Sequence, residues 1–481
     1  MNNDRLLALL GKYGQFDCCG GRFASKANKL LSGCLLLLVA GCGPPATAPL
    51  GEIADLLVYS QNALHYIDAA AADQPLLEQA RQQAAAEKFL INYFRPWDRS
   101  LKANPADQVF APLQDLHERT LYQGNLLPYG EEKKRSLVEL CDRTRYPSMD
   151  LRAVTLRDTD LRALPTQEPG FADPRQAGEG YPFDYFQYSA IPANTPVRIH
   201  HRSADRAWYL IETPHVTGWL PALDVAPVDD KFVERFRTGR YVTVLRDNVA
   251  LLDTGGNFRR NASIGALLPL SPSVSSGNRR VLIGVADSGG RGIVVEAELP
   301  GESAALWPLP ATQENMAGLM NQMMGKPYGW GGIAGNRDCS STLQDLFAAF
   351  GIDLPRNSAW QMRKGATVSL EGMSPERKEE LLLARGKPFL TLVGLPGHVM
   401  LYIGRQDDRA IVFHTKWGIR TVSANGKGRH LIGKTVITSL QPGRELPDID
   451  RPEGDLLERV DAIAFPARDK NPEKIAESIL P

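Results

Sequence analysis

The 481-residue sequence predicts a multidomain α+β protein: an N-terminal helical segment, two β-rich segments and a last segment of mixed helices and strands. Three observations support this prediction. The chain is 43% hydrophobic and 23% charged, which excludes a disordered protein. Helix-forming runs dominate from Leu56 to about Leu140, and short apolar runs divided by turns replace them from about Leu151. After Pro308 both patterns occur, so helices and strands share the last segment.

Charge excludes one class of partner. Lys plus Arg (55) and Asp plus Glu (55) cancel, so the chain has no overall basic field to hold a phosphate backbone. We therefore expect no nucleic-acid partner.

The first 41 residues have the pattern of an export signal. Arg22, Lys26 and Lys29 precede an apolar run over 30–40, which is too short to span a bilayer but fits the core of a signal peptide. The run ends in Val39-Ala40-Gly41-Cys42, which resembles the lipobox of bacterial lipoproteins. That resemblance implies that Cys42 carries a lipid and becomes the first residue of the mature chain. The alternative is a short buried helix with a chance cysteine.

A lipid on Cys42 would place the protein outside the cytoplasm. We expect it to be anchored on the periplasmic face of a bacterial membrane, with residues 43–49 as a tether. Gly43 stands where an aspartate would signal retention in the inner membrane, so the outer membrane is favoured if the cell is Gram-negative.

Residues 42–150 are expected to form a helical domain after the tether, interrupted where Pro96 cannot continue a helix. Cys141 in this domain is expected to be a buried thiol. Residues 151–230 read as strands, and their Gly218-Trp219-Leu220 resembles the penultimate strand of a bacterial SH3 domain. Residues 231–310 resemble a second SH3-like barrel of the same class.

A candidate nucleophile lies in the last segment, which we place at 311–445. Tyr328-Gly329-Trp330-Gly331-Gly332 leads to Asp338-Cys339-Ser340, and a helical pattern begins there. Backbone N–H groups at a helix N-terminus lack partners and favour a thiolate over a thiol. Cys339 is therefore the candidate nucleophile.

A thiolate nucleophile needs a base, and two histidines follow on strand-like runs. His398 is the candidate base, and His414 could orient its ring as the third member of a triad. The histidines and cysteines after residue 42 show no paired ligand spacing, so we expect no metal and no cofactor.

Residues 314–440 resemble the NlpC/P60 family of papain-like cysteine peptidases, which share the Tyr-x-Trp-Gly-Gly loop, the Asp-Cys-Ser motif and the Gly-His-Val strand. The whole mature chain is similar to the SH3-containing subgroup that cleaves cell-wall peptides. The resemblance implies hydrolysis of the bond between D-γ-glutamate and the diamino acid of peptidoglycan stem peptides or murein fragments. It also implies that the Cys339 N–H and Tyr328 are oxyanion donors. Asp338 and Ser340 would then be substrate contacts.

Other features of the sequence allow more than one interpretation. In relatives the first barrel packs on the peptidase cleft, and Tyr185, Trp208 and Tyr209 could contact substrate or belong to the barrel core. A charged insertion over 375–382 could border the cleft or be a solvated helix. Residues 446–481, rich in proline and charge, are expected to be a surface strap. Alternative functions are a catalytically silent wall-binding lipoprotein and a wall amidase or acyltransferase.

Overall fold

The computed structural model describes residues 52–273, 277–424 and 426–468. The predicted export signal and the lipidation site Cys42 lie outside these residues. Over the described ranges, no helix combines the length and the apolar character that a membrane span requires.

The N-terminal region is helical, as predicted. It contains α1 (Ala54–Val58), α2 (Gln79–Tyr93), α3 (Ala106–Val109), α4 (Pro112–Glu118), α5 (Glu131–Leu140) and the 3-10 turns η1 (Ala63–Tyr66), η2 (Arg95–Trp97) and η3 (Arg143–Arg145). Helix α2 ends just before Pro96, which sits in η2 because its ring cannot continue an α-helix.

The buried side chains of these helices lie in cores that they share with the other parts of the chain. Phe110 and Leu116 pack with Trp219 of the first barrel. Other residues of the region join the cores of the second barrel and of the C-terminal domain, and these include Phe89, Trp97, Leu76 and Leu77. The region therefore contributes apolar side chains to the cores of the other three parts and stabilises them in this way. Cys141 is fully buried among them, as predicted.

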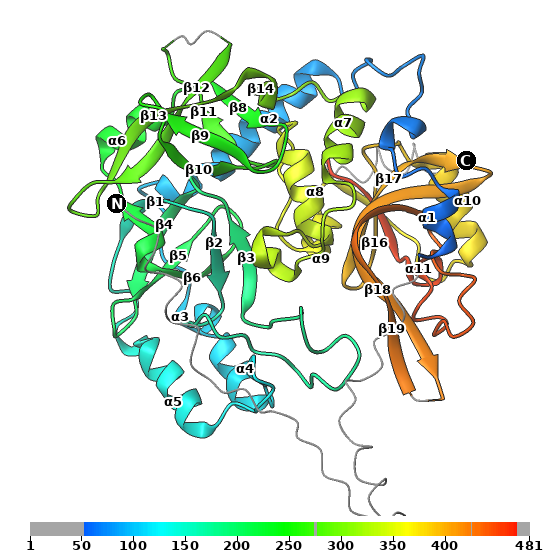
Figure 1. Cartoon of the computed structure of the whole chain (residues 1–481), viewed down its shortest axis with the longest axis horizontal. Helices are drawn as coiled ribbons and strands as arrows, with labels where there is room; N and C mark the ends of the chain where they lie inside the picture. The colour runs from blue at the N-terminus through cyan, green and yellow to red at the C-terminus, as the bar shows by residue number, and fades with distance from the viewer. Residues whose placement is uncertain (1–51, 274–276, 425, 469–481) are drawn as a thin grey trace, which may run out of the picture. The chain divides into compact units, whose positions relative to one another are not determined.

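The first barrel is one seven-stranded sheet of order β3-β2-β6-β5-β4-β1-β7. Its strands are β1 (Leu151–Thr155), β2 (Thr159–Arg162), β3 (Gln187–Ile191), β4 (Pro196–Arg202), β5 (Trp208–Glu212), β6 (Thr217–Pro221) and β7 (Val225–Pro227), with η4 (Ala222–Asp224) between the last two. Gly218 lies so close to β2 that an added Cβ would come 2.8 Å from the carbonyl oxygen of Arg162. A long loop, residues 163–186, joins β2 to β3 and runs toward the C-terminal domain (Figure 1).

The second barrel divides into sheets of order β10-β9-β13-β12 and β11-β8-β14. Its elements are α6 (Asp230–Phe236), β8 (Tyr241–Val244), β9 (Val249–Asp253), β10 (Phe258–Ala262), β11 (Leu267–Pro269), β12 (Asn278–Ala286), β13 (Gly292–Pro300), η5 (Gly301–Ser303) and β14 (Ala304–Trp307). Two small SH3-like β domains in tandem were predicted, and the structure confirms this class of fold.

The C-terminal domain is built on a six-stranded sheet of order β15-β20-β16-β17-β18-β19. Its strands are β15 (Ala366–Ser369), β16 (Leu392–Leu395), β17 (His398–Gln406), β18 (Arg409–Ser423), β19 (Gly426–Ser439) and β20 (Ala462–Phe465). Its helices are α7 (Gln313–Met323), η6 (Trp330–Gly335), α8 (Cys339–Ala348), α9 (Ser358–Gln361), α10 (Pro375–Arg385) and α11 (Leu456–Arg459). Helix α8 packs on one face of the sheet, where Leu343 and Phe347 share a core with Val399 and Phe413. The domain is mixed α+β, as predicted.

The prediction of a surface strap after residue 445 is wrong for residues 456–465. Strand β20 pairs with both β15 and β16 inside the sheet. Leu456, Val460 and Ile463 are buried. The proline- and charge-rich composition hid these few apolar residues, which bury enough surface to hold the segment in the domain.

The charged insertion forms α10 and packs on the face of the sheet opposite α8. Its Lys378 Nζ donates a 2.7 Å hydrogen bond to the carbonyl oxygen of Glu458, and Glu379 pairs with Arg409 on β18 at 3.1 Å. The helix is therefore part of the fold rather than a free solvated helix.

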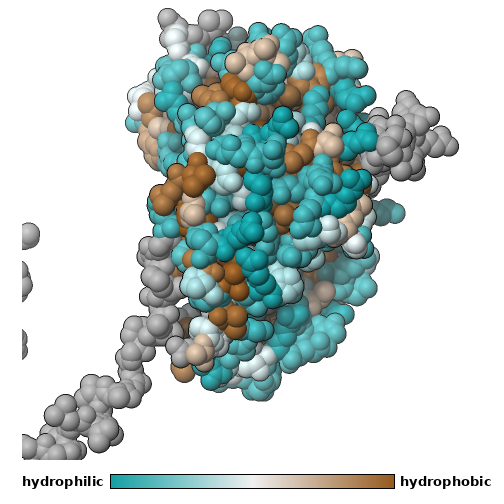
Figure 2. Space-filling model, turned by 90° about the vertical axis from the view of Figure 1, so that its right-hand side faces the viewer, coloured by the Kyte–Doolittle hydropathy of each residue, from teal (hydrophilic) through white to brown (hydrophobic). Residues whose placement is uncertain are grey.

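The face of the molecule seen in Figure 2 is mainly hydrophilic, with its hydrophobic residues in separate patches, in keeping with the balanced charge.

Candidate active site

Helix α8 begins at Cys339, with Asp338 as its N-cap in a capping box with Ser341. The Asp338 carboxylate accepts from the Ser341 N–H at 2.8 Å and from the Gly331 N–H at 3.1 Å. Side-chain capping satisfies the orphan N–H groups of the first turn and fixes where the helix starts. The cysteine is therefore held at the first helical position.

The glycine pair of the motif lets this loop touch the first barrel. Gly331 and Gly332 have φ values of 60° and 85°. A Cβ on Gly331 would lie 2.6 Å from Gln187, and one on Gly332 would lie 2.5 Å from Ala190. Only glycine combines these backbone angles with so close an approach to β3. The Gln187 side chain then donates to the carbonyl oxygen of Gly331 at 3.1 Å.

Burial controls the state of the thiol. Cys339 is 8% exposed, and burial raises its pKa to about 12, with the Asp338 charge acting in the same direction. The Val399 N–H and the Arg356 charge act against this rise. The expectation that the helix N-terminus would favour a thiolate is therefore outweighed by desolvation. At rest the sulfur is a neutral thiol that needs a base.

The two predicted histidines form a pair. His398 Nε2 and His414 Nδ1 lie 2.8 Å apart, and His414 Nε2 lies 3.1 Å from Thr438 Oγ1. This contact uses Nε2 of His398 and leaves Nδ1 available to the thiol. The residue after His398 is Val399, whose N–H acts on the Cys339 thiol, so the strand brings His398 close to Cys339. Burial lowers the pKa of both histidines, and the charge of Lys416 lowers it further.

Tyr328 lies beside the same sulfur. Burial raises the pKa of its phenol, and negative charge on Cys339 and Asp338 would raise it further. The phenol therefore keeps its proton and can donate a hydrogen bond, as an oxyanion donor must.

Asp338 and Ser340 are occupied by protein contacts. Arg356 donates from Nη2 to Asp338 at 2.7 Å and from Nη1 to Ser340 Oγ at 2.9 Å. Burial alone would raise the pKa of Asp338, but the charge and hydrogen bonds of Arg356, together with the cap, hold it below its usual value. Both residues are under 10% exposed. Their role as substrate contacts stays a prediction.

Arg356 was missed by sequence reasoning. Besides its contacts near the nucleophile, its Nε donates to Ser189 Oγ on β3 of the first barrel at 2.7 Å. One guanidinium therefore joins the barrel to the first turn of α8. No local pattern around Arg356 reveals this, because its partners come from distant parts of the chain.

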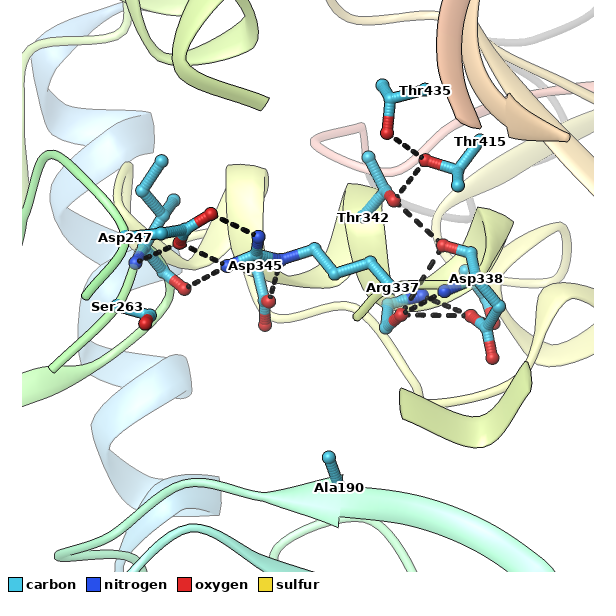
Figure 3. A network of polar contacts seen from close by, with 12 residues as sticks. Ala190, Asp247, Ser263, Arg337, Asp338, Thr342, Asp345, Thr415 and Thr435 are labelled. Atoms are coloured by element: carbon cyan, nitrogen blue, oxygen red, sulfur yellow. Dashed lines mark hydrogen bonds and ion pairs between the residues drawn. The ribbon is translucent and has the colours of Figure 1, made fainter. Parts of the chain in front are cut away.

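A second set of contacts fixes the segment around the nucleophile (Figure 3). Arg337 donates from Nη1 and Nη2 to the Asp247 carboxylate, both at 2.8 Å, and from Nε to Asp345 on α8 at 2.6 Å. On the other side, Thr342 Oγ1 lies 2.5 Å from Thr415 Oγ1, which lies 2.8 Å from Thr435 Oγ1. The second barrel and strands β18 and β19 thus hold the start of α8 from two directions.

The 163–186 loop of the first barrel reaches the candidate site. Phe183 stacks edge-on against Trp330, with ring centroids 5.2 Å apart, and against Trp417 on β18 at 6.0 Å. Trp330 Nε1 donates to the carbonyl oxygen of Asp184 at 3.0 Å. Tyr328 and Trp417 rings lie 5.6 Å apart. Aromatic side chains of the first barrel and of the C-terminal domain therefore form one cluster that includes Tyr328 and Trp330 of the glycine-rich loop.

The three barrel aromatics differ in their surroundings. Trp208 is 9% exposed and packs in the core shared with the N-terminal helices, so it is a core residue. Tyr209 packs against the core of the first barrel. Tyr185 is 41% exposed, with the Arg119 guanidinium 5.5 Å from its ring centroid. Of the three, Tyr185 is the exposed residue, and the Arg119 guanidinium lies over its ring.

Lys416 is the other residue that sequence reasoning missed. It lies on β18 two residues after His414 and is 8% exposed. The signal was a lysine within the strand-like run that contains His414. Among the described residues, no group of three or more His, Cys, Asp or Glu side chains is placed to hold a metal ion.

Family models match four parts of the chain. They are the NLPC_P60 stabilising domain at residues 30–146, an SH3 domain of SH3b1 type at 169–221, an SH3 domain of SH3b2 type at 229–274 and the NlpC/P60 family at 325–433. These ranges agree in order with the domains expected from the sequence.

A solved structure is similar to most of this chain. The NlpC/P60 endopeptidase from Photobacterium damselae subsp. piscicida is 26% identical, with a TM-score of 0.78, over 86% of this chain and 98% of that one. An NlpC/P60 family protein from Bacillus cereus is 17% identical, covers 58% of this chain and 82% of its own, and has a TM-score of 0.40. No curated protein sequence matches the chain.

Proposed function

Because this chain carries an NlpC/P60 domain behind a stabilising domain and two SH3 domains, we propose that it is a cysteine peptidase that hydrolyses peptidoglycan stem peptides. The observation that carries the proposal is local. Cys339 occupies the first position of α8 beside Val399, and the preceding His398 bonds His414. A thiol, an imidazole and an orienting group in this order are the parts of a nucleophilic triad.

The reaction follows from the protonation states. His398 Nδ1 takes the proton of the neutral Cys339 thiol as the sulfur attacks the scissile carbonyl carbon. The backbone N–H of Cys339 and the phenol of Tyr328 donate to the oxyanion. The imidazolium then protonates the leaving amine, and a thioester to Cys339 remains. Water, deprotonated by His398, hydrolyses the thioester and restores the thiol.

His414 has a supporting role in this reaction. Its hydrogen bond to Nε2 holds the His398 ring so that Nδ1 faces the sulfur. Burial lowers the pKa of His398, which keeps the imidazole neutral and able to accept the thiol proton.

The bond proposed for cleavage is that between D-γ-glutamate and the diamino acid, and this rests on the family resemblance. We further propose that the first barrel limits the substrate to small wall fragments. The contacts of Phe183 with Trp330 and Trp417 support this, because they bring the 163–186 loop to the candidate site.

A product analysis tests the proposed reaction. The purified protein and its Cys339→Ala variant are incubated with muropeptides in water enriched in oxygen-18, and the products are identified by mass spectrometry. We expect the parent alone to release glutamyl-terminated fragments with one heavy oxygen in the new carboxylate. Release of intact stem peptides from the sugar would indicate an amidase, products without heavy oxygen an acyltransferase, and binding without cleavage a silent wall-binding protein.

The membrane anchor is a separate proposal that rests on the lipobox-like sequence alone. We propose that Cys42 is lipidated and holds the enzyme on the periplasmic side of the membrane. The full chain and its Cys42→Ala variant would be expressed in bacteria fed an alkyne fatty acid. Label on the parent alone supports the anchor, and an unlabelled parent contradicts it.

A further inference from the structure

Lys416 is a buried cation on β18. The residue is 8% exposed, and within residues 52–273, 277–424 and 426–468 the structure gives its ammonium no hydrogen bond and no ion pair. Burying an unpaired charge is costly, so a fold without a use for it would replace it by an apolar side chain.

The ammonium lies at the candidate site. Side chains alternate along a strand, so Lys416 shares a face of β18 with His414. Its charge lowers the pKa of His414 and of His398, and a thiolate at Cys339 would raise its own. The ammonium therefore lies close enough to both histidines and to Cys339 for its charge to act on them.

The groups around Lys416 add positive charge. Arg420, Arg429 and Arg459 all act on its pKa. Glu453 is shared by Arg420 at 3.2 Å and Arg459 at 3.5 Å, while Glu179 and Asp450 act on Arg429. The Nε of Arg429 is buried without a hydrogen-bond partner. The nearby carboxylates therefore balance the charges of the arginines, and the positive charge of Lys416 stays unbalanced.

We propose that Lys416 binds a carboxylate of the substrate on the leaving side of the scissile bond, and so selects a diamino acid that carries an extra side-chain carboxylate over one that does not. In stem peptides this means meso-diaminopimelate rather than lysine. The inference rests on the proposed function.

The side of the bond follows from the arrangement of the elements. Asp338, Ser340 and Arg356 line the side of α8 that faces the first barrel. His398, which must protonate the leaving amine, comes from the sheet. Lys416 stands on that sheet beside His414, and hence beside the leaving group.

The test measures specificity. Three peptides are compared: L-Ala-γ-D-Glu-meso-diaminopimelate, the same peptide ending in L-lysine, and the diaminopimelate peptide with D-isoglutamine in place of D-glutamate. The parent, Lys416→Met, Lys416→Arg and Lys427→Met are assayed for kcat/KM. Lys427→Met is the matched control, because Lys427 is exposed on β19 of the same hairpin. Binding of the peptides to Cys339→Ala and Cys339→Ala/Lys416→Met by calorimetry gives a readout without turnover.

We expect the parent to prefer the diaminopimelate peptide over the lysine peptide by about 10- to 100-fold, as a charged hydrogen bond provides. Lys416→Met should bring that ratio close to one, Lys416→Arg should retain part of it, and Lys427→Met should leave it unchanged. Calorimetry should show the same loss of preference.

An unchanged ratio in Lys416→Met, with cleavage intact, would overturn the inference alone. A loss of discrimination between glutamate and isoglutamine instead would place Lys416 on the acyl side and also overturn it. If the parent cleaves none of the peptides and Cys339→Ala binds none, the proposed function itself fails.

Discussion

Arg337, two residues before the proposed nucleophile Cys339, forms a bidentate ion pair with Asp247 of the second barrel, with both N–O distances at 2.8 Å. Its Nε also pairs with Asp345 on α8. Burial disfavours the charged form of Arg337, but these two carboxylates outweigh it and raise its pKa. A barrel that is distant in sequence therefore fixes the backbone from which Cys339 extends.

Removing Asp247 should disturb both stability and catalysis. Asp247→Ala leaves the buried guanidinium with Asp345 and the carbonyl oxygen of Ile264 as partners, and breaking a buried ion pair typically costs about 3 kcal/mol or more. We expect a lower thermal midpoint and a fall in kcat that exceeds any rise in KM, because the nucleophile moves while the substrate contacts stay. Glu302→Gln, an exposed change on the same barrel, is the control. A variant with unaltered midpoint and kcat would show that the barrel does not position the nucleophile.

Substitutions can separate the hydrogen-bonding role of His414 from the effect of its size. His414→Ala removes the partner of His398 Nε2, and we expect kcat to fall by about 10²- to 10⁴-fold. His414→Gln keeps an amide that can bond the ring and should retain more activity. Thr438→Val, which removes the second partner of His414, should have the smallest effect. Equal rates in the alanine and glutamine variants would argue against an orienting role. Steady-state kinetics on the diaminopimelate tripeptide decides between them.

The activity should follow the neutral thiol and imidazole. Because burial lowers the pKa of His398 below its ordinary 6.5, the acid limb of kcat/KM should lie below pH 6.5. Burial raises the pKa of the Cys339 thiol to about 12, so thiol ionisation should not limit activity near neutral pH. Alkylation by iodoacetamide, followed by intact mass, should be slow at pH 7 and speed up in alkali. Fast alkylation at pH 6 would indicate a preformed thiolate instead.

Lys416 should add a second limb to the pH profile of kcat/KM, and this limb should depend on the substrate. Burial lowers its pKa to about 7, with the neighbouring arginines acting in the same direction. As the free enzyme loses this proton, kcat/KM for the diaminopimelate peptide should fall above about pH 7. The lysine peptide, and the Lys416→Met variant with either peptide, should not show this fall. The same alkaline fall in the variant would assign it to another group.

The same lysine should reduce stability. Unfolded, its amine holds a proton up to about pH 10.5, whereas the folded protein releases it at about pH 7. Between these values the unfolded state binds more protons, so the contribution of this group to stability rises with pH. We expect Lys416→Met to melt at a higher temperature than the parent at pH 6, and the difference to shrink toward pH 10. A variant that melts lower at pH 6 would show that the ammonium is not an uncompensated charge.

Local motifs predicted the chemical core of the site. The Asp-Cys-Ser sequence places a cap and a cysteine at the start of a helix, and the glycines before it predict a tight loop. These signals depend on neighbouring residues, so they can be read from the sequence. The apolar runs around His398 and His414 likewise predict two strands that can pair, and β17 and β18 do pair in the fold.

The parts that escaped prediction depend on distant partners. Arg356 and Asp247 act through residues far from them in sequence, and no pattern near either one shows it. Strand β20 was hidden because pairing with β15 and β16, rather than its own composition, makes it a strand. The effect of burial on Cys339 was missed for the same reason, because the helix N-terminus is visible in the sequence and the surrounding core is not.

The most direct test of the central claim is a single cleavage assay. The purified protein and Cys339→Ala are incubated with L-Ala-γ-D-Glu-meso-diaminopimelate, and the products are followed by mass spectrometry. Cys339-dependent hydrolysis of the γ-glutamyl bond predicts release of L-Ala-D-Glu and free diaminopimelate by the parent and none by the variant. Equal release by both proteins, or an intact peptide with a parent that binds it, would contradict the account.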